Sequence, residues 1–255
     1  MSRQDEQAAA ARTEQLAGNL AAVQARIEGA CAAAGRGADE VTLVAVTKFF
    51  PAEDVLRLAG LGLREFGENR DQEASAKAAL VAEQLRRGGY PAFPHPESVR
   101  LSWHFVGQLQ TNKARSVVSY ADVIQSVDRL RLVGALDTAA ERAGRTPECL
   151  VQVNLDLDAQ GRGGAEPAEV ERIADAVADA GPLRLGGLMA VAPLGADPRP
   201  AFERLAEIAA KVRGAHADAV SLSAGMSADL EAAVAAGATH VRIGSALLGA
   251  RPPLR

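Results

Sequence analysis

The chain has 255 residues, of which 48% are hydrophobic and 24% charged, and this composition is globular rather than disordered. A formal net charge of −4 argues against nucleic acid or an acidic membrane surface as the main partner. The first residues, MSRQDEQ, lack the apolar core of a signal peptide, and no apolar run reaches the ~18 residues of a membrane span. The two cysteines, Cys31 and Cys149, are far apart and not in metal-ligand spacing, so we expect a reduced, cytoplasmic protein without a metal site.

Strands and helices are predicted to alternate along almost the whole chain. An amphipathic helix is expected between Arg12 and Ala34, after a flexible tail over residues 1–11, because apolar residues recur there at helical spacing. Apolar and β-branched runs then predict strands over Val41–Lys48, Leu63–Phe66, Leu101–Val106, Asp122–Gln125, Cys149–Asn154, Leu185–Met189, Ala219–Leu222 and Thr239–Ile243. One helix is predicted after each strand, over Ala52–Ala59, Arg70–Arg87, Lys113–Val118, Asp128–Ala143, Pro167–Ala180, Pro200–Arg213, Ser227–Ala236 and Ser245–Leu248. Two segments rich in glycine or proline are expected to form loops, Gly88–Glu97 and Gly161–Gly164.

This alternation implies parallel strands joined by right-handed crossovers. Eight strands, each followed by a helix, is the number that a (β/α)8 barrel needs. We therefore predict an α/β protein with a single domain over residues 1–255, a TIM barrel preceded by an extra N-terminal helix. An open doubly wound sheet is the competing architecture.

Lys48 ends the first predicted strand, VTLVAVTK. An uncharged run of this kind is typical of a strand buried on both faces in a parallel sheet. Pro51 follows closely and suits the first turn of a helix. Because ligands of α/β barrels bind at the carboxyl ends of the strands, we expect a pocket around the amine of Lys48.

The last two strands run into loops of small residues, SAGMS at residues 223–227 and Gly244-Ser245. In phosphate-binding barrels the anion lies between the loops after strands seven and eight, where small residues let the backbone approach and hydroxyls add donors. The alternative is that Ser227 caps the next helix and that the glycines only make turns. Neither GxGxxG nor a Walker lysine loop is present, so a dinucleotide or nucleoside triphosphate is not indicated. The residues that we predict to bind a phosphate are Ser223, Gly225, Gly244 and Ser245.

Three further residues lie at or near the expected mouth of the barrel. Arg242 is inside the eighth strand and should point to the same side as His240; it either contacts the ligand or forms a salt bridge at the strand end. Asn69 closes the second strand and either lies against a planar ligand or caps the following helix. Met189, at the end of the sixth strand, is expected in the pocket floor or the core.

The third strand and the helix after it carry other candidate residues. Trp103 is expected in the core, and His104 as a hydrogen-bonded structural histidine rather than a catalytic base. Lys113 is expected to be a solvated helix lysine rather than the anchor of a second phosphate.

A lysine at the first strand and a phosphate site at the last two strands would face the same mouth, because a barrel brings strand one beside strand eight. An amine and an anion site across one barrel suit a phosphorylated aldehyde or ketone held as a Schiff base. Two classes of protein meet this description. One holds pyridoxal 5′-phosphate as a permanent aldehyde, and the other is a Schiff-base aldolase acting on a sugar phosphate.

From about Val41 to Arg251 the chain resembles the pyridoxal phosphate homeostasis protein family, whose barrel is similar to the alanine racemase N-terminal domain. The motifs that carry this resemblance are VAVTKFFP (44–51), FGENRDQE (66–73), WHFVGQLQTNK (103–113), LMAVAP (188–193), LSAGMSAD (222–229) and VRIGSALLGAR (241–251). The resemblance implies that pyridoxal 5′-phosphate is held as a Schiff base on Lys48, with Asn69 and Met189 beside the ring and Arg242 near the pyridine nitrogen. It also implies a phosphate site surrounded by Ser223, Gly225, Met226, Gly244 and Ser245.

The resemblance leads us to expect a protein that binds, buffers and delivers the cofactor, with effects on amino-acid metabolism, and that does not turn a substrate over. A guanidinium at Arg242 cannot accept a proton and would leave the pyridine nitrogen unprotonated, which makes the ring a poor electron sink. Racemases on this barrel add a second domain with a catalytic tyrosine, and neither Tyr90 nor Tyr120 lies at a strand end with an obvious role. A pyridoxal-dependent amino-acid racemase is the alternative. The expected partners are the cofactor and apo-enzymes that use it, and the expected state is a monomer.

Overall fold

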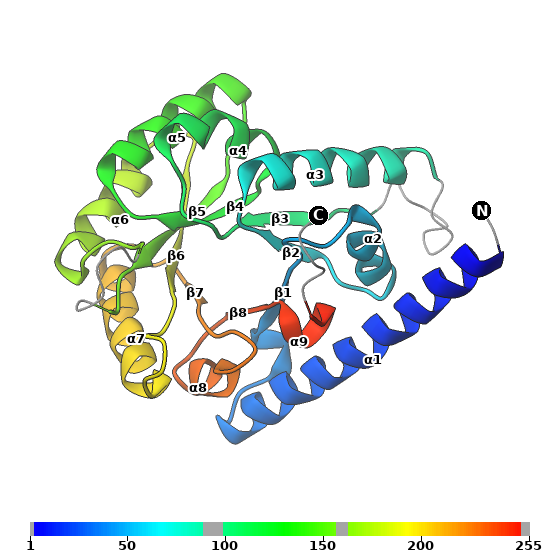
Figure 1. The fold of residues 1–255 in the computed structure, drawn as a ribbon. Helices are drawn as coiled ribbons and strands as arrows, with labels where there is room; N and C mark the ends of the chain where they lie inside the picture. Colours follow the sequence, from blue (N-terminus) through cyan, green and yellow to red (C-terminus); the bar gives the residue numbers. More distant parts are fainter. Residues whose placement is uncertain (1–2, 89–98, 157–162, 251–255) are drawn as a thin grey trace.

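The computed structural model describes residues 3–88, 99–156 and 163–250. Its centre is a closed barrel of eight parallel strands in which β1 pairs with both β2 and β8 (Figure 1). The strands are β1 (Thr42–Val46), β2 (Glu65–Glu68), β3 (Ser102–Phe105), β4 (Val123–Val127), β5 (Glu148–Val153), β6 (Arg184–Ala190), β7 (Ser221–Ser223) and β8 (His240–Ile243). The closed strand order confirms the predicted (β/α)8 barrel and excludes the open doubly wound sheet.

Helices surround the barrel, and those between consecutive strands return the chain to the start of the next strand (Figure 1). They are α1 (Arg3–Ala33), α2 (Ala52–Gly60), α3 (Asp71–Arg86), α4 (Ala114–Tyr120), α5 (Leu130–Ala143), α6 (Val170–Asp179), α7 (Pro198–Ala215), α8 (Leu230–Ala235) and α9 (Ser245–Leu248). Local signals explain several of their ends. Asp197 precedes α7 and accepts a hydrogen bond from the backbone of Arg199, and Gly144 ends α5 in the left-handed conformation.

The first helix begins at Arg3, so the expectation of a flexible tail is wrong for residues 3–11. Alanines fill residues 8–11 and Asp5 and Glu6 lie in the first turn, and both features favour helix. The long α1 packs along α8, α9 and α2 (Figure 1). It therefore contacts helices from both the beginning and the end of the barrel's sequence. Ion pairing of Arg12 with Asp54 on α2 adds an anchor near its N-terminal end.

Every strand differs from its predicted bounds at one or both ends, and local hydrogen bonds explain the later starts of β2 and β7. β2 lies later than Leu63–Phe66, because the backbone N–H of Leu63 bonds to Leu58 and closes the turn after α2. Gly67 belongs to the strand, where an added Cβ would lie only 3.3 Å from methyl groups of Val44 and Val46. β7 begins at Ser221 rather than Ala219, whose N–H bonds to His216 in a turn.

The apolar core lies between the strands and the surrounding helices, in two clusters that divide the ring of helices between them. The inside of the barrel is different, because buried polar residues from four strands occupy it. These are His104, Gln125, Ser223 and Arg242. Branched apolar residues usually fill the interior of such barrels. The buried polar residues here are instead hydrogen-bonded to one another, which offsets the cost of burying them.

Some expectations lie outside the described residues. Nearly all of the Gly88–Glu97 segment and the first half of Gly161–Gly164 belong to the ranges that are not described. Over residues 3–88, 99–156 and 163–250, no helix is both long and apolar enough to cross a membrane.

Candidate functional site

A cavity of about 370 Å³ opens at the carboxyl ends of the barrel strands. This volume lies in the range of small-molecule sites, roughly 300–1,000 Å³. Seven of the nine predicted site residues line it, and these are Lys48, Asn69, Met189, Met226, Arg242, Gly244 and Ser245. Its other lining residues are Val46, Phe50, Val106, Gln152, Val191, Ser227, Ala228 and Gly249.

Lys48 reaches the cavity from a turn with unusual backbone geometry. It lies two residues beyond the end of β1, and Phe49 after it has a φ of 71°, in the left-handed region that non-glycine residues seldom adopt. The N–H of Phe49 donates to a carboxylate oxygen of Glu73 on α3. Backbone strain of this kind persists only where neighbouring contacts hold it, and it concentrates at functional sites.

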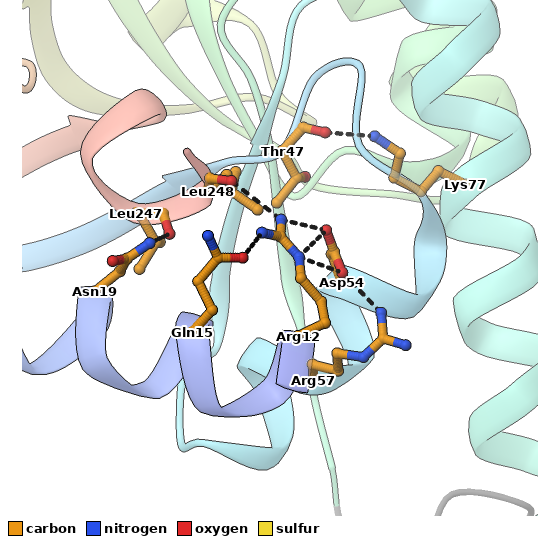
Figure 2. Close-up of polar contacts among 9 residues, drawn as sticks. All are labelled: Arg12, Gln15, Asn19, Thr47, Asp54, Arg57, Lys77, Leu247 and Leu248. Carbon is orange, nitrogen blue, oxygen red and sulfur yellow. Dashed lines mark hydrogen bonds and ion pairs between the residues drawn. The ribbon is translucent and has the colours of Figure 1, made fainter. Parts of the chain in front are cut away.

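A buried ion-pair network lies behind this turn. Lys77 on α3 is 5% exposed, and its Nζ donates to the carbonyl of Thr47 at 2.8 Å (Figure 2). The same Nζ donates to the Glu68 carboxylate at 2.5 Å. The hydroxyl of Thr47 donates to the same carboxylate oxygen of Glu68 at 2.6 Å. Burial raises the pKa of the Glu68 carboxyl, and the Lys77 charge offsets only part of that effect. The network ties the residue before Lys48 to both β2 and α3.

The two loops predicted to bind phosphate are joined by Ser227. Its Oγ accepts a hydrogen bond from the backbone N–H of Ala246 at 3.3 Å and lies 3.4 Å from the hydroxyl of Ser245. The helix after β7 begins at Leu230, so Ser227 is not its N-cap, and the capping part of the alternative is wrong. Asp229 instead holds the loop by accepting from the N–H of Met226 at 2.6 Å. Ser227, Met226 and Ser245 therefore present one hydroxyl-rich wall to the cavity.

Two of the predicted phosphate residues do not line the cavity. Ser223 is fully buried, and its hydroxyl lies between Gln125 and Arg242 inside the barrel. Gly225 has a φ of 90°, and a Cβ there would lie 2.7 Å from the Cβ of Ala233. Both residues have structural roles in this geometry. The carbonyl of Gly225 accepts a hydrogen bond from the backbone N–H of Arg242, and the hydroxyl of Ser223 accepts one from the Arg242 side chain.

Arg242 is buried and points into the barrel. Its two terminal nitrogens donate to the hydroxyl of Ser223 at 2.7 Å and to the carbonyl of Ala190 at 2.8 Å. The alternative of a salt bridge at the strand end is wrong, since within the described residues no carboxylate lies within ion-pair distance of it. Burial lowers the pKa of Arg242 to about 10, so the guanidinium remains protonated at neutral pH.

Asn69 lines the cavity and does not cap the helix that follows it. The following helix begins at Asp71 after Arg70, so Asn69 is not its N-cap. Its Oδ1 is buried and has no hydrogen-bond partner in the described part of the chain. Gly107 packs against its backbone so closely that an added Cβ would lie 2.1 Å from the carbonyl oxygen of Asn69. The glycine of the WHFVG motif thus sets the position of Asn69.

The N-terminal helix reaches the cavity walls through a clasp made by two of its polar side chains. Arg12 pairs with Asp54 of α2 at 2.7 Å and donates to the carbonyl of Leu248 on α9, and Asn19 donates to the carbonyl of Leu247 (Figure 2). The guanidinium of Arg12 also lies 5.6 Å from the ring centre of Phe50, a cavity residue. Arg12 and Leu248 are 236 positions apart in the sequence, so no local sequence pattern predicts this contact.

The remaining candidates behave as expected. Trp103 is 7% exposed and packs in the core. His104 is buried in the barrel and hydrogen-bonded to Glu65 and Gln125, which confirms a structural histidine. Lys113 is partly exposed and pairs with Asp71 at 3.5 Å.

Comparisons with known proteins show the family to which the chain belongs. Residues 18–252 match the family model described as alanine racemase, N-terminal domain. The pyridoxal phosphate homeostasis protein of Mycobacterium leprae is 44% identical over 247 residues, which cover 93% of each chain. The structure of PipY from Synechococcus elongatus PCC7942, solved with PLP bound, is 33% identical with a TM-score of 0.75 and is matched over 92% of this chain and 100% of its own. An unknown protein from Bifidobacterium adolescentis has a TM-score of 0.84 at 31% identity, over 93% of this chain and 96% of its own.

The closed barrel and the family model define a protein of the alanine racemase N-terminal-domain class. Within that class, the chain belongs to the pyridoxal phosphate homeostasis protein family, as the identity over nearly its whole length requires. The resemblance inferred from the sequence motifs is thereby confirmed.

Proposed function

We propose that this chain is a cytoplasmic protein that binds pyridoxal 5′-phosphate on Lys48 and buffers and delivers it to enzymes that use it. One observation carries the proposal. Lys48 shares a single cavity of about 370 Å³ with the hydroxyls of Ser227 and Ser245 and with Arg242. Pyridoxal 5′-phosphate supplies an aldehyde that bonds covalently to a lysine amine, and a phosphate that hydroxyls and backbone N–H groups can hold.

The residues present suit this ligand. The buried, unpartnered Oδ1 of Asn69 is a polar group that a bound molecule can meet, since buried polar atoms are rarely left without a partner. Met189, Val106 and Phe50 give the cavity apolar walls against which a flat ring can pack. The related PipY was solved with PLP bound, and the curated relatives are named for pyridoxal phosphate homeostasis.

The electrostatics of the cavity favour holding the cofactor over turning a substrate over. Lys48 and Arg242 are the ionisable residues among the described lining. Arg242 stays protonated near neutral pH and can only donate hydrogen bonds, so a pyridine nitrogen facing it would remain unprotonated. Catalysis of racemisation would also need a second acid or base, and Tyr120 lies outside the cavity lining.

The purified protein should show an absorbance band near ~420 nm, the region in which pyridoxal 5′-phosphate bound to a lysine absorbs. Lys48→Ala should abolish the band, and the matched variant Lys113→Ala should keep it, because Lys113 lies outside the cavity and pairs with Asp71. A Lys48→Ala protein that retains the full band would contradict the proposal.

Delivery is tested by mixing the loaded protein with an apo-enzyme that requires pyridoxal 5′-phosphate. Activity of the enzyme should recover as the band of the donor protein declines. The alternative, an amino-acid racemase, predicts entry of solvent deuterium at the α carbon of alanine or serine, and the shared barrel class is the observation that favours testing it.

A further inference from the structure

Hydrogen bonds between side chains cross the inside of the barrel from the cofactor cavity to its opposite mouth. Arg242 donates to Ser223 Oγ at 2.7 Å, and Ser223 Oγ donates to Gln125 Oε1 at 2.7 Å. Gln125 Nε2 lies 2.7 Å from His104 Nδ1, and His104 Nε2 lies 2.7 Å from Glu65 Oε2. The residues come from β8, β7, β4, β3 and β2, so the chain of contacts passes through the barrel and does not follow one strand (Figure 1).

The two ends of this chain determine the direction of every bond. A guanidinium can only donate, so the hydroxyl of Ser223 accepts from Arg242 and directs its own proton to the oxygen of Gln125. The amide nitrogen of Gln125 must then face His104, whose Nδ1 accepts. The ring proton of His104 is therefore on Nε2, where it donates to the Glu65 carboxylate. All four bonds run the same way, from a buried cation to a carboxylate.

The residues of this chain of hydrogen bonds are buried, so each polar group needs a partner to offset the cost of burial. Ser223 and Gln125 are fully buried, His104 is 2% exposed and Arg242 is 5% exposed. Burying polar groups is costly unless each has a partner, and a complete network is rigid because its bonds polarise one another. Burial opposes the ionisation of Glu65, but hydrogen bonds from His104 and Ser102 outweigh it and lower the pKa of this carboxyl.

We propose that Ser223, Gln125, His104 and Glu65 form a hydrogen-bonded relay that positions the side chain of Arg242. None of these four relay residues lines the cofactor cavity, so they act through Arg242 and not on the ligand. The consequence for the ligand rests on the proposed function: the relay fixes the donor that a pyridine ring nitrogen would meet.

The first test needs no cofactor. Nitrogen-15 NMR of histidine side chains in the unliganded protein near neutral pH should show His104 neutral, with the proton on Nε2 and an unprotonated Nδ1. Loss of the signal in His104→Asn assigns it. A neutral ring protonated on Nδ1, or a doubly protonated ring, would overturn the relay. Because no ligand is present, this outcome is independent of whether pyridoxal 5′-phosphate binds.

The second test compares two buried serines. Ser223→Ala removes a relay member, whereas Ser126→Ala removes a buried hydroxyl on β4 that has no hydrogen-bond partner in the described residues. The guanidinium N–H signals of Arg242 should exchange with water roughly tenfold faster in Ser223→Ala, the factor that corresponds to losing one hydrogen bond to a charged group. Ser126→Ala should match the wild type, and equal exchange in the two variants would contradict the proposal.

The cofactor provides the third measurement. Titration with pyridoxal 5′-phosphate should give roughly tenfold weaker binding and a displaced absorbance maximum for Ser223→Ala, and neither change for Ser126→Ala. Gln125→Glu should bring a proton onto His104 Nδ1, because a carboxylate can only accept. An unchanged His104 signal in Gln125→Glu would contradict the relay even if Ser223→Ala failed to fold.

Discussion

Gly225 carries a steric requirement that a single methyl group can test. Its φ of 90° disfavours any side chain, and a Cβ would lie 2.7 Å from Ala233. Gly237 has a similar φ of 95° but open space around it. Gly225→Ala should therefore lower the free energy of unfolding by about 2–4 kcal/mol, against about 1 kcal/mol for Gly237→Ala. Urea denaturation measures both, and equal losses would show that the contact with Ala233 is unimportant.

His240, also inside the barrel, predicts a pH dependence of stability. Burial, followed by the nearby His104, lowers the pKa of His240 to about 4. The unfolded chain binds a proton near the ordinary pKa of about 6.5, so stability falls as pH drops from there to the folded pKa and then levels off. The loss attributable to this group is up to about 3 kcal/mol. His240→Gln should flatten the curve of unfolding free energy across that window, and an unchanged slope would refute the assignment.

At the scale of elements, α3 holds the turn that presents Lys48. Lys77→Met should lower the free energy of unfolding by about 3–5 kcal/mol, since it leaves the buried Glu68 carboxylate without its cation. The double variant Lys77→Met/Glu68→Leu should recover much of this loss. Because Lys77 also holds the carbonyl of Thr47, the single variant should bind pyridoxal 5′-phosphate more weakly. Additive losses in the double variant would show that the two groups are not coupled.

The α1 helix is predicted to matter for the cavity as well as for stability. Arg12→Ala removes the ion pair with Asp54, whose side chain is only 4% exposed, and the hydrogen bond to the carbonyl of Leu248. It should lower the free energy of unfolding by about 2–3 kcal/mol. Arg26→Ala, which removes a surface pair with Glu231 and a hydrogen bond to the carbonyl of Ser227, should cost less, about 1 kcal/mol. Thermal unfolding of the two variants gives the comparison, and a loss for Arg12→Ala no larger than that for Arg26→Ala would exclude the clasp.

At the scale of the whole molecule, the sequence was sufficient for the barrel and for the mouth at which the cavity opens. Alternating apolar runs and helical periods are local signals, and they predicted the order of all the strands. The positions of Lys48 shortly after β1 and of Gly244-Ser245 after β8 followed from that order, since a barrel places these strands side by side.

What the sequence could not supply was the pairing of distant polar side chains. Ser223 looked like a phosphate residue because it precedes a glycine loop, but its partner Gln125 lies 98 positions away and draws the hydroxyl into the barrel. Arg12 and Lys77 carried no local motif, and their importance appears only when α1 and α3 are packed. The start of α1 was missed because helix propensity in its alanine run was given too little weight.

The central claim is that Lys48 is the residue that carries pyridoxal 5′-phosphate. Borohydride reduction of the loaded protein, followed by digestion and mass spectrometry, locates the cofactor among the chain's four lysines, Lys48, Lys77, Lys113 and Lys211. We expect the reduced cofactor on the peptide that contains Lys48. Labelling of Lys77, Lys113 or Lys211 in its place, or no labelled peptide from loaded protein, would contradict it.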